Sequence, residues 1–203
     1  MLVTGIKSKP VYAPLAADTG GRYHLMLGAG VGREPLLRVL GELQAAAPDA
    51  LARTRVLYVP TTGDATAAGG MQFPGIQELR LFEGAPALLA DFGALLQTAL
   101  MGTRLYVAGP ESFIGLAMKI ALSFNLNKDE IRAEECGTLA RRVHCVHCRA
   151  ETEDVRTNIV RCTGCGRWLL VRDHYSRRLA AYMGVMVDAE APGELPPIQE
   201  VFT

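Results

Sequence analysis

The sequence predicts an α/β protein made of a parallel-sheet domain followed by a small four-cysteine module. Three observations lead to this fold class. Short apolar runs alternate with helical patterns over residues 1–138, a glycine-rich loop directly follows the first of these runs, and two Cys-x-x-Cys pairs lie within residues 139–178. A chain of 203 residues can hold one medium-sized domain and one small one.

Strand and helix patterns alternate through the first part of the chain. Strands are expected at 23–27, 55–59, 76–82 and 104–107, where apolar residues are bounded by Gly or Pro. Helices are expected at 34–46, 86–100 and from Pro110 to about Phe124. This alternation implies a parallel sheet with helices on both faces.

The formal net charge of zero hides an uneven distribution of charged residues. Residues 1–138 carry 12 basic and 13 acidic side chains, residues 139–178 carry nine arginines against four acids, and residues 179–203 carry four acids and no base. We therefore expect four segments: an N-terminal extension (1–21), an α/β domain (22–138), a four-cysteine ribbon with a C-terminal helix (139–187) and an acidic tail (188–203). A neutral total removes the bulk-charge argument for nucleic-acid or membrane-surface binding.

The sequence predicts a cytoplasmic protein. The most apolar stretch, Phe113–Phe124, contains Lys119 and is far shorter than the roughly 20 residues that span a bilayer. The N-terminal MLVTGIKSKP has two lysines but no apolar run after them of the kind a signal peptide needs. Cysteines in a reducing cytoplasm more often bind metal or do redox work than form disulfides.

Four of the five cysteines have the spacing of a tetrathiolate metal site. Two Cys-x-x-Cys pairs are separated by 13 residues, and they comprise Cys145, Cys148, Cys162 and Cys165. Such a site holds zinc structurally or a single iron for electron transfer, and we favour zinc because a small module needs the folding free energy. A disulfide pair or buried free thiols is the less favoured interpretation. His144 and His147 are not needed as ligands, and Cys136 is expected to be a packed core thiol.

The residues after the second cysteine pair predict a strand and then a helix. Trp168–Val171 is the expected strand, and Asp173 or Ser176 would cap a helix that ends at Gly184. We favour a helix that packs on the ribbon with a solvated charged side. The alternative is a docking element for an acidic partner.

Gly28, Gly30 and Gly32 lie between the first strand and the first helix. Glycines at this place either let the backbone approach a phosphate or simply make a tight bend. The run GAGVGREPLLRVL, which includes Pro35, resembles the loop of ferredoxin-reductase-type nicotinamide-binding domains. RLYVAGPESFIGLAMKIALSFNL and IRAEECG resemble the later strand, Gly-Pro turn, helix and final strand of the same domain. The resemblance covers about residues 22–137 and makes these three glycines and Pro35 candidate NAD(P)-binding residues.

The sequence departs from that family where the nucleotide would bind. Glu34 stands where the family has Thr, and its carboxylate would repel a pyrophosphate. Ala108 replaces the Cys beside the nicotinamide, and Cys136 stands where a Phe is usual. With about 20 residues before the first strand, no flavin-binding barrel is expected. The domain either binds nucleotide for a partner's flavin or, as we favour, keeps the fold and has lost the ligand.

The C-terminal part resembles a second family. CVHC and the run TNIVRCTGCGRWLLVRDHYSRRLAAYMGVMVDAEAPGE are similar to the DmmA-like subunits of dimethylamine monooxygenase. The resemblance implies a small subunit of a multi-subunit oxygenase that uses NADPH and O2 to convert dimethylamine to methylamine and formaldehyde, with haem and flavin/iron–sulfur chemistry on other subunits. Only the four cysteines match a functional pattern, as metal ligands, and no catalytic residue is predicted.

Three functions follow from these observations. The first is a non-catalytic, metal-binding accessory subunit of such an oxygenase. The second is a rubredoxin-like electron carrier with iron in the four-cysteine site. The third is a zinc-ribbon nucleic-acid-binding protein, which only the nine arginines support, because few aromatic residues are interleaved with them.

Overall fold

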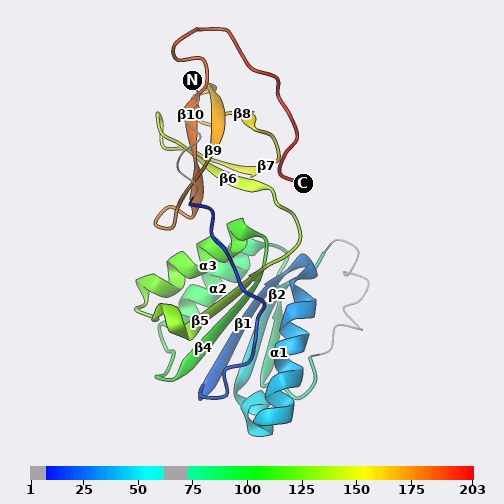
Figure 1. The fold of residues 1–203 in the computed structure, drawn as a ribbon. Helices are drawn as coiled ribbons and strands as arrows, with labels where there is room; N and C mark the ends of the chain where they lie inside the picture. Colours follow the sequence, from blue (N-terminus) through cyan, green and yellow to red (C-terminus); the bar gives the residue numbers. More distant parts are fainter. Residues whose placement is uncertain (1–7, 62–72) are drawn as a thin grey trace. The chain divides into compact units, whose positions relative to one another are not determined.

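The computed structural model describes residues 8–61 and 73–203, which form two units (Figure 1). One unit comprises residues 12–137. The other combines residues 8–11 with residues 138–203. We predicted residues 1–21 as one N-terminal extension, but residues 8–11 belong to one unit and residues 12–21 belong to the other.

The unit of residues 12–137 contains a five-stranded sheet in the order β3-β2-β1-β4-β5. Every neighbouring pair in it is parallel. Its strands are β1 (Tyr23–Ala29), β2 (Thr54–Val59), β3 (Glu78–Leu81), β4 (Thr103–Gly109) and β5 (Ile131–Glu135). The predicted parallel α/β architecture is therefore confirmed.

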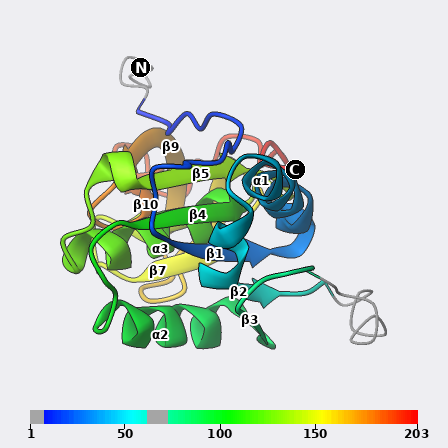
Figure 2. The ribbon, with the colours of Figure 1, turned by 90° about the horizontal axis from the view of Figure 1, so that it is seen from below.

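Three α-helices cover the two faces of this sheet (Figure 2). They are α1 (Arg33–Ala46), α2 (Ala85–Leu96) and α3 (Glu111–Ser123), and short 3-10 turns occur at 30–32, 48–53 and 128–130. Strand residues alternate between the faces: Leu25 and Leu57 pack with α2 and α3, whereas Met26 packs with α1. The second helix ends at Leu96, four residues before the predicted end, and a turn follows it.

A segment without regular structure completes the core on the α1 side. Leu15 is only 2% exposed and belongs to the same core cluster as the buried face of α1. Its backbone N–H donates to Glu134 Oε2 at 2.5 Å, and its carbonyl accepts from Arg38 Nε at 3.3 Å. Three residues later, Asp18 forms ion pairs with Arg104 and Arg132, each at 2.8 Å. Residues 12–18 are therefore part of the α/β unit.

The second unit contains a mixed five-stranded sheet in the order β7-β6-β10-β9-β8. Its strands are β6 (Arg141–Cys145), β7 (Glu151–Val155), β8 (Ile159–Arg161), β9 (Trp168–Ser176) and β10 (Ala181–Met186). β10 pairs parallel with β6 and antiparallel with β9. β6–β7 and β8–β9 are antiparallel pairs.

The predicted helix from Asp173 to Gly184 is wrong, because these residues form the end of β9, a turn and β10. Tyr175 and Tyr182 lie opposite each other across the two strands, with ring centroids 5.0 Å apart. Their spacing of seven residues fits two helical turns as well as two strands joined by a turn. The strand pairing wins because it buries both tyrosines, at 7% and 1% exposure, in the core of this unit.

The end of the chain folds back onto the second unit. Asn158 N–H donates to the Gln199 carbonyl at 3.0 Å, and Val201 N–H donates to the Arg156 carbonyl at 2.9 Å. Arg141 then places its guanidinium carbon 3.8 Å from the centre of the Phe202 ring and 4.0 Å from the centre of the Tyr182 ring. The segment predicted as an acidic tail thus contributes to the core. Across the described residues, no helix combines the length and apolarity needed to cross a bilayer.

Candidate metal centre

The four cysteines lie on two turns with the same backbone pattern. The first knuckle is Cys145–Ala150, which follows β6, and the second is Cys162–Arg167, which follows β8. In the first, Arg149 N–H donates to the Cys145 carbonyl and Cys145 N–H donates to Ala150, both at 2.9 Å. In the second, Gly166 N–H donates to the Cys162 carbonyl at 3.0 Å and Cys162 N–H donates to Arg167 at 2.9 Å. Because both turns have this hydrogen-bond pattern, each turn places its two cysteines on the same side of the turn.

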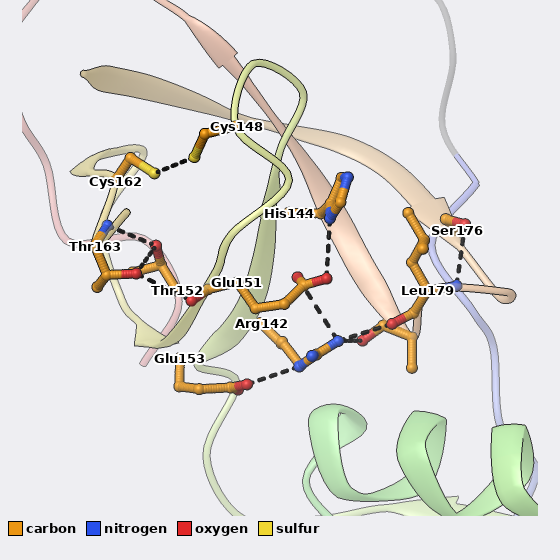
Figure 3. A network of polar contacts seen from close by, with 11 residues as sticks. Arg142, His144, Cys148, Glu151, Thr152, Glu153, Cys162, Thr163, Ser176 and Leu179 are labelled. Atoms are coloured by element: carbon orange, nitrogen blue, oxygen red, sulfur yellow. Dashed lines mark hydrogen bonds and ion pairs between the residues drawn. The ribbon is translucent and has the colours of Figure 1, made fainter. Parts of the chain in front are cut away.

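The four sulfur atoms have the spacing of a tetrahedral metal site. They all lie within 4.8 Å of one another. The Sγ atoms of Cys145 and Cys165 are 3.9 Å apart. Those of Cys148 and Cys162, which Figure 3 shows, are 3.5 Å apart. Zn–S bonds of about 2.3 Å in a tetrahedron place sulfurs about 3.8 Å apart. The residues therefore fit a tetrathiolate ion. All five cysteines are free thiols, so the disulfide alternative receives no support.

Burial and hydrogen bonding differ among the four thiols. Cys145 and Cys162 are buried, whereas Cys148 is exposed. The N–H groups of Gly164 and Cys165 point at Cys162 Sγ, at 3.4 and 3.5 Å. Hydrogen bonds from the Arg167 backbone N–H, from the Arg167 side chain and with two of the other sulfurs together lower the pKa of Cys165 to about 6, although desolvation opposes them. The Ala150 N–H lowers the pKa of Cys148, but partial desolvation by the neighbouring groups and hydrogen bonds with the other three sulfurs outweigh it and raise the pKa to about 12.

Gly164 allows the two knuckles to approach each other. A Cβ at this position would lie 2.6 Å from Ala150 Cβ and 3.1 Å from Cys148 Sγ. The nearby Thr163 bonds the second knuckle to β7, because its hydroxyl donates to the Glu151 carbonyl at 3.0 Å and lies 3.3 Å from the Thr152 hydroxyl. The sequence shows that Gly164 lies between two cysteines, but the spacing of the cysteines does not reveal its contact with the first knuckle.

The two histidines near the cysteines are engaged with other side chains. His144 Nδ1 lies 2.9 Å from Glu151 Oε1, and the Glu151 carboxylate also pairs with Arg142 (Figure 3). His147 Nδ1 lies 3.1 Å from Nη1 of Arg167. In the described part of the chain, the only cluster of potential metal ligands is the four cysteines.

Cys136 belongs to the unit of residues 12–137 and not to the unit that holds this site. It is half-buried against the α1 core, and its N–H donates to the Gly109 carbonyl at 2.9 Å. Burial raises the pKa of its thiol, and the charges of Glu134 and Glu135 raise it further. These are the properties of a packed, unreactive thiol.

The predicted glycine loop lies at the end of β1, and packing accounts for two of its glycines. A Cβ on Gly28 would lie 2.6 Å from Tyr58 Cδ2, and a Cβ on Gly32 would collide with the carbonyl of Ala108. The Tyr58 hydroxyl donates to the Gly30 carbonyl. The glycines thus let the start of α1 pack closely against β4, which is one role of glycine in this turn.

The first turn of α1 carries the remaining predicted residues. Pro35 is buried in the core, so its role there is packing. The Glu34 side chain is 79% exposed, and its carboxylate lies 3.6 Å from Arg33. The sequence analysis assigned no role to Glu111. This residue is only 3% exposed at the start of α3 and accepts a hydrogen bond from the Tyr12 hydroxyl at 3.4 Å.

Comparison with known families agrees with both parts of the chain. The N-terminal domain of "Dimethylamine monooxygenase subunit DmmA-like" proteins matches residues 4–131, and the C-terminal domain of the same proteins matches residues 142–185. The chain belongs to the DmmA-like family. The family resemblance predicted from the sequence is therefore confirmed.

This DmmA-like chain is also similar to a curated protein from Ectopseudomonas mendocina (strain ymp). The two are 34% identical over 120 residues, and the relative is named "Heme-dependent oxidative N-demethylase delta subunit". The match covers 59% of this chain and 63% of the relative, so it spans less than two thirds of that protein.

Two solved structures of reductases are similar to this chain at low sequence identity. The ferredoxin reductase in carbazole 1,9a-dioxygenase (FAD apo form) has a TM-score of 0.44 at 15% identity, covering 61% of this chain and 34% of the reductase. Phthalate dioxygenase reductase has a TM-score of 0.46 at 14% identity, covering 68% of this chain and 45% of the reductase.

Proposed function

We propose that this DmmA-like chain is a metal-binding accessory subunit of a multi-subunit, NADPH-dependent oxygenase in the cytoplasm. The complex would oxidatively demethylate dimethylamine to methylamine and formaldehyde, with haem and flavin/iron–sulfur groups on its other subunits. The observation that carries the proposal is the four-sulfur cluster on two matched knuckles, in a chain that belongs to this family. The name of the curated relative, a subunit of a haem-dependent N-demethylase, supports the assembly.

The metal that we assign to Cys145, Cys148, Cys162 and Cys165 is zinc, in a structural role. Four protein thiolates leave no open position for water or substrate, which is typical of structural rather than hydrolytic zinc. Cys145 and Cys162 also belong to the core cluster of this unit, which contains eight buried residues. A metal that joins these two cysteines supplies folding free energy to a core that is small by itself.

The α/β unit has a scaffolding role in this proposal and does not bind NAD(P). Gly28 and Gly32 are explained by packing, and Glu34 places a negative charge in the first turn of the helix where a phosphate would bind. Isothermal titration calorimetry with NADH and NADPH should therefore show no binding in the micromolar range. Micromolar affinity for either nucleotide would contradict this part of the proposal.

Metal analysis and spectroscopy of the full-length protein test the proposed site. We expect one zinc per chain and no absorption in the visible range, because zinc(II) has a filled d shell. One iron per chain, with a red colour that bleaches on reduction, would replace the structural role with electron transfer. The third function would require binding to nucleic acid with a steep salt dependence, which a filter-binding assay measures.

Purification of the chain from native cells tests the proposed assembly. An affinity-tagged chain should copurify with haem- and flavin-containing subunits in fixed ratio, and the complex should consume NADPH with dimethylamine. A chain that elutes alone at native expression level, with no copurifying subunit, would overturn the assignment as a subunit.

A further inference from the structure

The two knuckles share a backbone but carry different side chains. The hydrogen bonds match Cys145–Ala150 with Cys162–Arg167, residue by residue. At the second, third and fifth positions, Val146 corresponds to Thr163, His147 to Gly164, and Arg149 to Gly166. At each of these positions, the first knuckle has the bulkier or more apolar residue. A purely structural metal site would not need this difference, since the second knuckle shows that smaller residues form the same turn.

Packing explains why the second knuckle has small side chains at these positions, but it does not explain why the first knuckle has larger ones. Gly164 must be small because Ala150 and Cys148 lie against it, and the Thr163 hydroxyl is used within the unit. By contrast, Val146 is 50% exposed, and His147 and Arg149 are exposed as well. We call these three residues, together with the exposed Cys148, the knuckle face.

Arg149 adopts a backbone conformation that disfavours its side chain. Its φ is 65°, and φ at the matching Gly166 is 70°. A Cβ on Gly166 would meet nothing within 4 Å, so glycine is favoured there by backbone conformation alone. The Arg149 side chain makes no hydrogen bond or ion pair with the described residues. Strain without an internal contact in return points to a use outside the chain.

We propose that the knuckle face docks against an acidic surface of another subunit of the oxygenase complex, with Arg149 as its charged anchor. This inference rests on the proposed function as an accessory subunit. Arginine and exposed apolar side chains side by side are typical of the centres of protein interfaces. Arg167, whose Nη1 lies 3.1 Å from His147 Nδ1, adds a second positive charge to that of Arg149, and the two arginines favour an acidic rather than a basic partner surface.

A second explanation for Arg149 makes the opposite prediction. Four thiolates and one divalent ion carry a net charge of about −2, which nearby arginines would partly neutralise. If Arg149 served this purpose, its removal would weaken metal binding and lower the melting temperature. If it serves docking, replacement by glycine relieves strain, leaves the metal in place and affects only the partner.

The test compares Arg149→Gly and Arg149→Glu with wild type, using the full-length zinc-loaded chain. Arg178→Glu is the matched control, because Arg178 is exposed in the turn between β9 and β10. The probe is the complex of the remaining oxygenase subunits, purified without this chain and immobilised on a biosensor. Melting temperature and zinc content are measured on the same samples.

We expect Arg149→Gly to keep its zinc and to melt about 2–4 °C higher than wild type, because the backbone strain is relieved. Its affinity for the immobilised subunits should fall about 10-fold, and that of Arg149→Glu about 100-fold, with smaller differences at high salt. Arg178→Glu should bind like wild type.

Three results would overturn the inference. Equal affinity of wild type and Arg149→Glu would exclude the knuckle face as a docking surface while leaving the subunit assignment intact. Loss of zinc or a lower melting temperature in Arg149→Gly would assign Arg149 to the metal site instead. A wild-type chain that does not bind the other subunits at all would overturn the proposed function and this inference together.

Discussion

The contact between the two knuckles gives the sharpest prediction about the metal centre, through the change Gly164→Ala. The added methyl carbon would lie 2.6 Å from Ala150 Cβ. Non-bonded carbons approach to about 3.5–4.0 Å, so the knuckles would have to separate by about 1 Å. Metal–sulfur distances tolerate only about ±0.2 Å, and the second pair of cysteines cannot follow the first without distorting the tetrahedron.

The cost of this change follows from overpacking of a close contact. Such substitutions cost about 1–3 kcal/mol, which corresponds to about 5- to 150-fold weaker zinc binding if the strain appears only in the metal-bound state. Competition with a chromophoric chelator measures the affinity directly. The clash can also be removed by a change in the first knuckle, because Ala150→Gly removes the methyl group that the side chain of Gly164→Ala would strike.

A double-mutant cycle separates this contact from other effects of the substitution. The pair Gly164→Ala and Ala150→Gly should recover most of the lost affinity, although the sulfur of Cys148 at 3.1 Å still limits the recovery. Gly166→Ala is the control, since it strains the backbone of the same knuckle without a clash and should not be rescued by Ala150→Gly. Wild-type affinity for Gly164→Ala, or rescue of both variants alike, would refute the reasoning.

Three further predictions concern other parts of the chain. Cys162→Ser should lose the metal and the thermal transition of the unit of residues 138–203, and a variant that keeps both would exclude a structural role for the site. Burial lowers the pKa of His24 below its ordinary value of about 6.5, so the unfolded state takes up a proton more readily. The stability of the α/β unit should therefore fall as pH drops below about 6.5. In His24→Gln, the urea-denaturation midpoint should change less between pH 7 and pH 5 than it does in wild type. Phe202→Leu keeps an apolar contact but removes the ring 3.8 Å from Arg141, and should destabilise its unit by about 1 kcal/mol in chemical denaturation, whereas an unchanged midpoint would show that this contact contributes nothing.

Patterns that depend on neighbouring residues predicted most of the fold. The alternation of apolar runs and helical faces predicted four of the five parallel strands, because a buried strand and an amphipathic helix each leave a periodic signal, and the fifth came from the resemblance of IRAEECG to a reductase strand. The cysteine spacing predicted the knuckles, because each Cys-x-x-Cys turn is closed by hydrogen bonds within six residues. Both signals are local, so a single sequence carries them.

The errors arose where distant segments meet. The run from Tyr175 to Tyr182 has spacing that fits either a helix or a hairpin, and the hairpin is favoured because its strands bury both tyrosines while β10 also pairs with the distant β6. Likewise, Phe202 contacts Arg141 across 60 intervening positions, and Leu15 fills a core whose other members lie mostly on α1 and the sheet. The residues around Phe202 and around Leu15 form no local pattern that predicts these contacts.

The position of Ser8 has a consequence for how the protein is made. Its hydroxyl accepts a hydrogen bond from Tyr175 N–H at 2.8 Å, and its N–H donates to the Asp173 carbonyl at 2.9 Å, across 167 residues of sequence to Tyr175. On the ribosome, residues 8–11 emerge long before β9 exists, whereas residues 12–137 can fold as soon as they are complete. The metal-binding unit therefore closes last, and at the typical synthesis rate of about 5–20 residues per second its N-terminal piece waits roughly 10–30 seconds for its partner strand.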